Sequence, residues 1–211
     1  MAGLLDLLNS DIGKKLIDGA SEETGASKDK TASVLSMGLP LLMGAMKKNA
    51  STPEGASGLL SALSSGKHDG SILDNIGGLL GGGADKGVLD DGAGILSHVL
   101  GGKQSTVENT LSAKSGLDAG SISKILKMAA PVLLGLLGKQ KRENNIDNGN
   151  DLSSLLGSFL GGQPQENQSL IASLIDQDGD GSVLDDVADM VLGSKKKSGG
   201  LGGMLGGLFG K

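Results

Sequence analysis

The chain lacks residue types that often carry chemistry or recognition. It has no cysteine, no tryptophan, no tyrosine and only 2 phenylalanines. Without cysteine it can form no disulfide, thiolate metal site or cysteine nucleophile. Without aromatic side chains it has little on which single-stranded bases could stack. Its formal net charge of -5 also argues against binding to a phosphate backbone. These absences exclude thiol chemistry and argue against a nucleic-acid partner.

Targeting and membrane signals are missing as well. The first residues, MAGLLDLLN, carry no basic region, and Asp6 interrupts their apolar run, so they make a poor secretory signal. No uninterrupted apolar stretch reaches the roughly 18 residues typical of a membrane-spanning helix. We therefore expect a cytoplasmic protein.

The residues of common catalytic sites are also scarce. The 2 histidines are His68, in a Gly/Ser/Lys turn, and His98, near the end of an expected helix. No pair of ligands stands at i and i+4 on a helix, and no serine lies in a nucleophile elbow. A hydrolase that uses a metal as Lewis acid would need a base or an open coordination position, and the sequence offers neither. We predict that the protein is not an enzyme.

What the chain has in excess is glycine, with 38 of 211 residues against an average share of roughly 7%. Apolar residues recur with helical spacing, as in Leu170, Ile171, Leu174 and Ile175, and no period-2 strand pattern is evident. Thr52-Pro53 is typical of a helix start, with threonine as cap and proline in the first turn. The pattern predicts an all-α fold with an aliphatic core.

Two segments of the chain repeat. VLSMGLPLLMGAMKK (34–48) aligns with ILKMAAPVLLGLLGK (125–139), which places Pro40 on Pro131. Both segments are apolar nearly all round, so each predicts a buried central helix with a proline kink or break.

The flanking residues extend the match. A glycine suited to end a helix (Gly25 or Gly116) precedes each segment, followed by a new cap (Ser27 or Asp118). We predict two similar helical modules, 1–100 and 101–192, a polar linker near 140–150, and a tail at 193–211. The sequence leaves open whether the modules pack together or hang apart.

The second module contains a degenerate EF-hand-like loop at 176–187, DQDGDGSVLDDV. Acids at alternate positions followed by a glycine are typical of a loop that wraps around a hard cation. The predicted Ca²⁺ ligands are Asp176, Asp178, Asp180, Ser182 and Asp186. Mg²⁺ or Mn²⁺ are alternatives. The loop departs from an EF-hand at its last position, where Val187 replaces a bidentate glutamate.

Helix capping is the alternative interpretation of this loop. It accounts well for the related segments Asp69-Gly70-Ser71 and Asp85-Lys86-Gly87. It leaves Asp176 and Asp178 unexplained, because five acids within eleven residues repel one another unless a cation neutralises them. We therefore expect Ca²⁺ as a stabilising ion.

The tail combines lysines 195–197 with an apolar stripe, LGGMLGGLFG (201–210), in which glycine fills the intervening positions. Basic residues beside an apolar stripe favour contact with an anionic membrane surface, here through residues 195–211. The glycine spacing also permits close helix contact and self-association. A flexible tail, or one docked on its own domain, is the alternative, because so much glycine opposes a free helix.

The segments LLDLLNSDIGKKLI, VLSMGLPLLMGAMKKNASTPEGASGLL, HDGSILDNIGGLLGGG and DQDGDGSVLDDVADMVLG resemble bacterial proteins of domain-of-unknown-function family 937, the YidB-like group. The resemblance implies a compact all-α fold and no known activity. We expect a non-catalytic, Ca²⁺-stabilised structural or protein-interaction module with an unidentified partner. The alternative is a peripheral membrane or self-assembling protein that acts through its tail.

Overall fold

The computed structural model describes residues 4–81, 84–161, 167–169 and 171–172, which all belong to one compact unit. The described residues form helices and turns and no strand, which confirms the all-α prediction. The helices are α1 (Leu4–Asn9), α2 (Asp11–Thr24), α3 (Lys28–Asn49), α4 (Pro53–Ser64), α5 (Ser71–Asp74), α6 (Ile76–Leu80), α7 (Lys86–Leu100), the 3₁₀ turn η1 (Gly101–Lys103), α8 (Gln104–Ser115), α9 (Ala119–Glu143) and α10 (Gly149–Leu160).

Helix boundaries follow the capping residues of the sequence. The side chains of Ser27, Thr52 and Asp118 accept hydrogen bonds from backbone N–H groups in the first turns of α3, α4 and α9. Gly25 and Gly116 end α2 and α8 with φ of 70° and 68°. Only glycine adopts this left-handed conformation without steric cost, so the predicted starts and stops are confirmed.

The two longest helices, α3 and α9, form the middle of the core. Both continue through their prolines, Pro40 and Pro131, without the break that the sequence allowed. Leu42 and Leu133, which are equivalent in the sequence alignment, are both fully buried. The prediction that the two segments form buried central helices is confirmed, while their origin by duplication stays a prediction.

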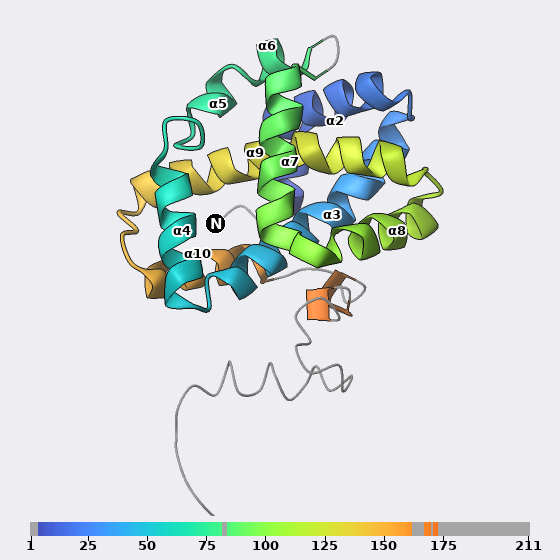
Figure 1. The fold of residues 1–211 in the computed structure, drawn as a ribbon. Coiled ribbons are helices and arrows are strands. Elements are labelled where there is room, and N and C mark those ends of the chain that lie inside the picture. The colour runs from blue at the N-terminus through green and yellow to red at the C-terminus, as the bar shows by residue number, and fades with distance from the viewer. Residues whose placement is uncertain (1–3, 82–83, 162–166, 170, 173–211) are drawn as a thin grey trace, which may run out of the picture. The chain divides into compact units, whose positions relative to one another are not determined.

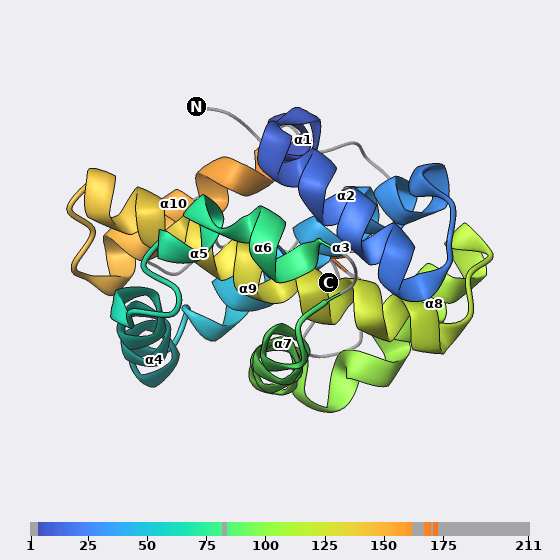
Figure 2. The ribbon, with the colours of Figure 1, turned by 90° about the horizontal axis from the view of Figure 1, so that it is seen from above.

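Helix α9 packs against most of the other helices. It contacts α2, α3, α4, α5, α7 and α8, and α7 crosses it in Figure 1. Figure 2 shows α4 and α7 nearly end-on, on the same flank of α9. Helices from 1–100 therefore pack directly on helices from 101–160, and the predicted modules are not separate packing units in this part of the chain. The connection between α9 and α10 is shorter than the predicted linker, because α9 continues to Glu143.

Helix α9 is also long and apolar enough, by length and composition, to cross a membrane. Most of it is buried inside the protein. The same composition is expected of the core helix of a globular domain.

Several helix crossings depend on glycine. A Cβ added at Gly92 of α7 would overlap the backbone carbonyl of Lys127 in α9. A Cβ at Gly138 of α9 would overlap the carbonyl of His68, and one at Gly19 of α2 would overlap that of Leu80. At these positions a side chain would separate the backbones, so glycine is required by the packing. Gly92 in particular sets how closely α7 lies on α9.

Candidate functional site: a cleft between α4 and α7

A cavity of about 760 Å³ lies between α4 and α7. Its size falls in the range of roughly 300–1,000 Å³ usual for small-molecule sites. Helices α3 and α9 contribute residues beneath α4 and α7. Apolar side chains dominate the lining and come from all four helices: Met46, Leu59, Ala62, Ile95, Val99 and Leu134.

Two exposed glycines line this cleft. A Cβ added at Gly58 of α4 or Gly94 of α7 would meet no other group within 4 Å, and both residues line the cavity. Among the glycines in the α-helices that the structure describes, no others have such open space. Packing therefore does not require glycine at these two positions, whereas it does at Gly92, only two residues from Gly94.

A buried histidine lines the cleft beside the N-terminal half of α7. His68 Nε2 lies 2.8 Å from Asp91 Oδ2, and His68 Nδ1 lies 3.3 Å from Ser65 Oγ. The side chain of His68 is 9% exposed and that of Asp91 is 25% exposed. Both ring nitrogens are hydrogen bonded, so the imidazole is fixed in orientation. The bond to Asp91 joins the turn after α4 to α7.

Asn49, the last residue of α3, lines the cleft beside the C-terminal end of α7. Its side-chain nitrogen donates to the backbone carbonyls of His98 and Val99, at 3.4 and 3.3 Å. These carbonyls belong to the last turn of α7, where they have no partner within the helix. Asn49 therefore holds the C-terminal end of α7 against α3, as His68 holds its N-terminal half.

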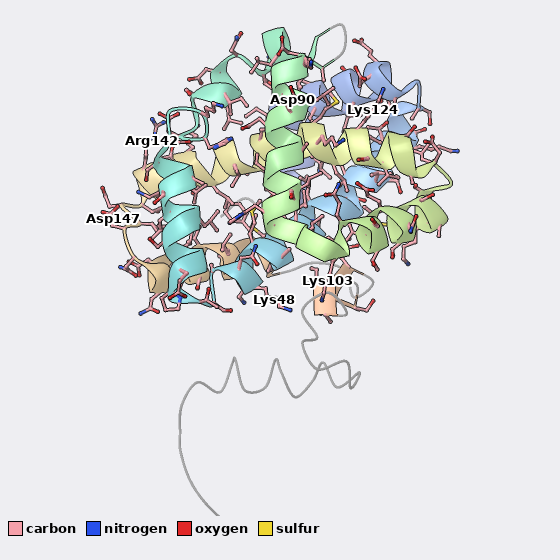
Figure 3. All side chains as sticks on the ribbon, in the orientation of Figure 1. Lys48, Asp90, Lys103, Lys124, Arg142 and Asp147 are labelled. Carbon is pink, nitrogen blue, oxygen red and sulfur yellow. The ribbon has the colours of Figure 1, made fainter. Side chains whose placement is uncertain are left out.

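Charged groups concentrate at the His68 end. Asp90 and Asp91 line the cavity from α7, and Lys67 lines it from the turn after α4. Figure 3 labels Asp90 on α7. Within the part of the chain that the structure describes, Asp90 and Lys67 form no ion pair, and one oxygen of Asp91 is engaged by His68. The cleft thus combines apolar side chains with Asp90, an exposed carboxylate that forms no ion pair in the described structure.

The acids that the capping interpretation assigned to helix starts do lie there. Asp85 Oδ1 accepts from the N–H of Gly87 at 2.7 Å at the start of α7. Asp69 Oδ1 accepts from the N–H of Ser71 at 3.0 Å, and this bond is the main reason that the pKa of Asp69 lies below its ordinary value. Hydrogen bonds to backbone donors favour the ionised carboxylate.

The predicted calcium ligands Asp176, Asp178, Asp180, Ser182 and Asp186, with their loop 176–187 and the tail 193–211, lie outside the described residues. Within those residues, no group of three or more His, Asp or Glu side chains could hold a metal ion.

Sequence reasoning missed this cleft. It placed His68 correctly in a turn and His98 in the last turn of a helix, but it did not pair His68 with Asp91. A signal was present, because positions 87, 91, 94 and 98 share one face of α7 and hold glycine, aspartate, glycine and histidine. Such a face is too small and polar to belong to the core.

The chain matches the family model described as bacterial protein of unknown function (DUF937) over residues 6–140 and 149–211. The protein belongs to this family. The gap in the match, 141–148, includes the connection between α9 and α10. No curated protein and no solved structure matches the chain. The family carries no assigned activity, so a function has to be argued from the cleft.

Proposed function

We propose that this DUF937 protein is a non-catalytic binding module and that the cleft between α4 and α7 receives the apolar part of a ligand. The observation that carries the proposal is the open space at Gly58 and Gly94. Glycine within a helix costs about 1 kcal/mol relative to alanine. At Gly92 the close approach of Lys127 explains this cost, but at Gly58 and Gly94 no packing contact does. Both glycines are exposed and line the cavity, and space for a ligand would account for them.

The arrangement of Ser65, His68 and Asp91 supports binding rather than nucleophilic catalysis. Ser65 Oγ lies 2.7 Å from the carbonyl of Ala62 and 3.3 Å from His68 Nδ1, so its hydroxyl is held by groups of the turn after α4. Ser65 is not among the residues that line the cavity, so its hydroxyl is not presented to a ligand there. The three residues instead tie the turn after α4 to α7. This supports a structural role for the three residues.

A Ca²⁺ ion at 176–187 remains part of the proposal as a stabilising element. The support is the alternation of Asp176, Asp178 and Asp180 before Gly181. Protein freed of metal should gain thermal stability when millimolar Ca²⁺ is added, because an ion that binds only the folded state stabilises it by mass action. A variant with all three aspartates changed to Asn should show no gain. An equal gain in both proteins would contradict the calcium site.

The alternative function, membrane contact or self-assembly through residues 195–211, rests on lysines 195–197 and the apolar stripe. Flotation with anionic vesicles and size-exclusion chromatography of the full chain and a 1–192 truncation test it. A loss of flotation or of oligomers on truncation would favour this alternative. Equal behaviour of the two proteins would remove the tail from consideration.

Binding in the cleft can be tested with N-phenyl-1-naphthylamine, a neutral apolar dye that brightens in apolar sites. The chain has no tryptophan or tyrosine, so it adds little background emission. The full chain should enhance the dye emission, and the double variant Gly58→Leu/Gly94→Leu should not, because two leucine side chains would project into the cavity between α4 and α7.

The matched control is Gly157→Leu. Gly157 is a helical glycine in α10 whose added Cβ would meet only the tip of the Lys47 side chain, and it does not line the cleft. This variant should retain the enhancement, and circular dichroism should show all three proteins equally helical. Equal enhancement by the folded double variant would refute the cleft as the binding site.

A further inference from the structure

We infer that the ligand of the α4–α7 cleft is a cationic amphiphile, a molecule with a linear apolar chain and an amine or quaternary ammonium head group. This inference rests on the proposed function and adds to it the chemistry of the head group. The apolar residues of the lining favour an apolar chain in the ligand, and the charged residues near His68 favour a cationic head group.

The lining accommodates an extended chain. Residues of α7 line the cavity from Gly87 to Val99, and the part from Asp90 to Val99 is about 14 Å long at a rise of about 1.5 Å per residue. Opposite them, α4 lines it from Gly55 to Ala62. The apolar residues that α7 contributes to the lining, Ile95 and Val99, lie in its C-terminal half, and the exposed glycines at 58 and 94 leave the space between the helices unfilled.

The head group follows from the balance of charge near His68. Asp90 and Asp91 contribute two carboxylates, against the single ammonium group of Lys67. Lys67 forms no ion pair with either of them in the described structure, and His68 engages only Oδ2 of Asp91. Asp90, which is exposed, therefore offers a carboxylate without an ion pair at the edge of the cleft. A carboxylate favours a cation, most strongly a donor that can form a charge-assisted hydrogen bond.

His98 also lines the cleft, in the last turn of α7 and away from Asp90. A ligand bound with its chain along α7 and its head at Asp90 would place the end of its chain toward His98. A ligand with an anionic head group would bind in the opposite orientation, with its head toward His98, or would place its head beside Lys67. The affinities of ligands that share one apolar chain and differ only in the charge of the head group distinguish these orientations.

The experiment is isothermal titration of the full chain at pH 7 with decylamine, decanol and decanoate, each below the concentration at which it forms micelles. Decylamine should bind about tenfold or more tightly than decanol, because hydrogen bonds to charged groups are stronger than neutral ones. Decanoate should bind most weakly. Asp90→Asn should reduce the affinity for decylamine to that for decanol and leave decanol unchanged.

Asp74→Asn is the matched control for net charge, since Asp74 is an exposed acid in α5 that does not line the cleft. It should leave all three affinities unchanged. Equal binding of decylamine and decanol, or tighter binding of decanoate, would overturn the head-group inference while leaving the cleft as an apolar site. If no ligand bound, or if the folded Gly58→Leu/Gly94→Leu variant bound them all as before, the proposed function itself would fail.

Discussion

His68 Nε2 and Asp91 Oδ2 lie 2.8 Å apart and join two segments that are 23 positions apart in the sequence. The backbone carbonyl of His68 also lies directly against Gly138 of α9, so the turn that carries the histidine is pressed onto the central helix. Through this turn, the position of α7 is tied to both α4 and α9. The pair therefore fixes the width of the cleft at its charged end.

Removal of Asp91 should destabilise the fold. Asp91→Ala leaves the buried Nε2 of His68 without its partner, and a buried polar group left unsatisfied costs about 1–3 kcal/mol. Asp90→Ala changes the neighbouring residue, which has no ion pair in the described structure, and should change stability by less than about 0.5 kcal/mol. Urea unfolding followed by circular dichroism measures both. Equal losses in the two variants would show that the His68–Asp91 bond contributes nothing to stability.

Two glycines of α7 should respond in opposite ways to the same substitution. Gly94→Ala should raise the free energy of unfolding by about 0.5–1 kcal/mol, because alanine favours the helix and meets no other group. Gly92→Ala should lower it, since the new Cβ would overlap the carbonyl of Lys127 and push α7 off α9. Thermal unfolding of both variants provides the measurement. A stabilising Gly92→Ala would contradict the close packing of α7 on α9.

The sequence predicted the local features of this fold well. Caps such as Ser27 and Asp118 act within a few residues of their own position, so their effect can be read from spacing alone. The buried helices were equally clear, because α3 and α9 are apolar on nearly every face.

The cleft could not be found in the same way. The bond between His68 and Asp91 exists only because α7 folds back across α9, and each residue alone is an ordinary surface type. The sequence also does not distinguish Gly92 from Gly94, although helix packing requires glycine at position 92 and does not require it at position 94. Both distinctions depend on which helices meet, and that is a property of the tertiary structure.

Substitution of core leucines should test the central position of α9. Leu133 is fully buried, so Leu133→Ala should cost about 2–5 kcal/mol, as buried leucines generally do. Leu136 lies on the same helix but is only partly buried, and Leu136→Ala should cost clearly less. Chemical denaturation compares the two at equal helix propensity. A cost at Leu133 no larger than that at Leu136 would be inconsistent with α9 as the core helix.

The pair Glu23–Lys124 should make part of the stability depend on pH. Lys124 Nζ lies 2.8 Å from Glu23 Oε1, and the backbone N–H of Ala84 donates to Oε2 at 3.3 Å. Figure 3 labels Lys124 on α9, and Glu23 lies in the last turn of α2. The hydrogen bond from Lys124 is the main cause that holds the pKa of Glu23 below its ordinary value of 4.5, with a smaller contribution from Ala84. The depressed pKa means that the folded state favours the ionised form more than the unfolded state does.

The contribution of Glu23 to the free energy of unfolding is therefore fully present well above pH 4.5. It is lost as the pH falls through 4.5 toward the lower pKa of Glu23 in the folded state. Because Lys124 is about half exposed, the contribution should not exceed about 1 kcal/mol. Glu23→Gln should therefore be less stable than the wild type at pH 7, and the difference should shrink at pH 3.5. Lys124→Gln should show the same loss of stability at pH 7 and the same smaller loss at pH 3.5. The double variant Glu23→Gln/Lys124→Gln should be little less stable than either single variant. Urea unfolding of the four proteins at both pH values measures this, and a gap between wild type and Glu23→Gln that stays constant with pH would contradict the ion pair as its source.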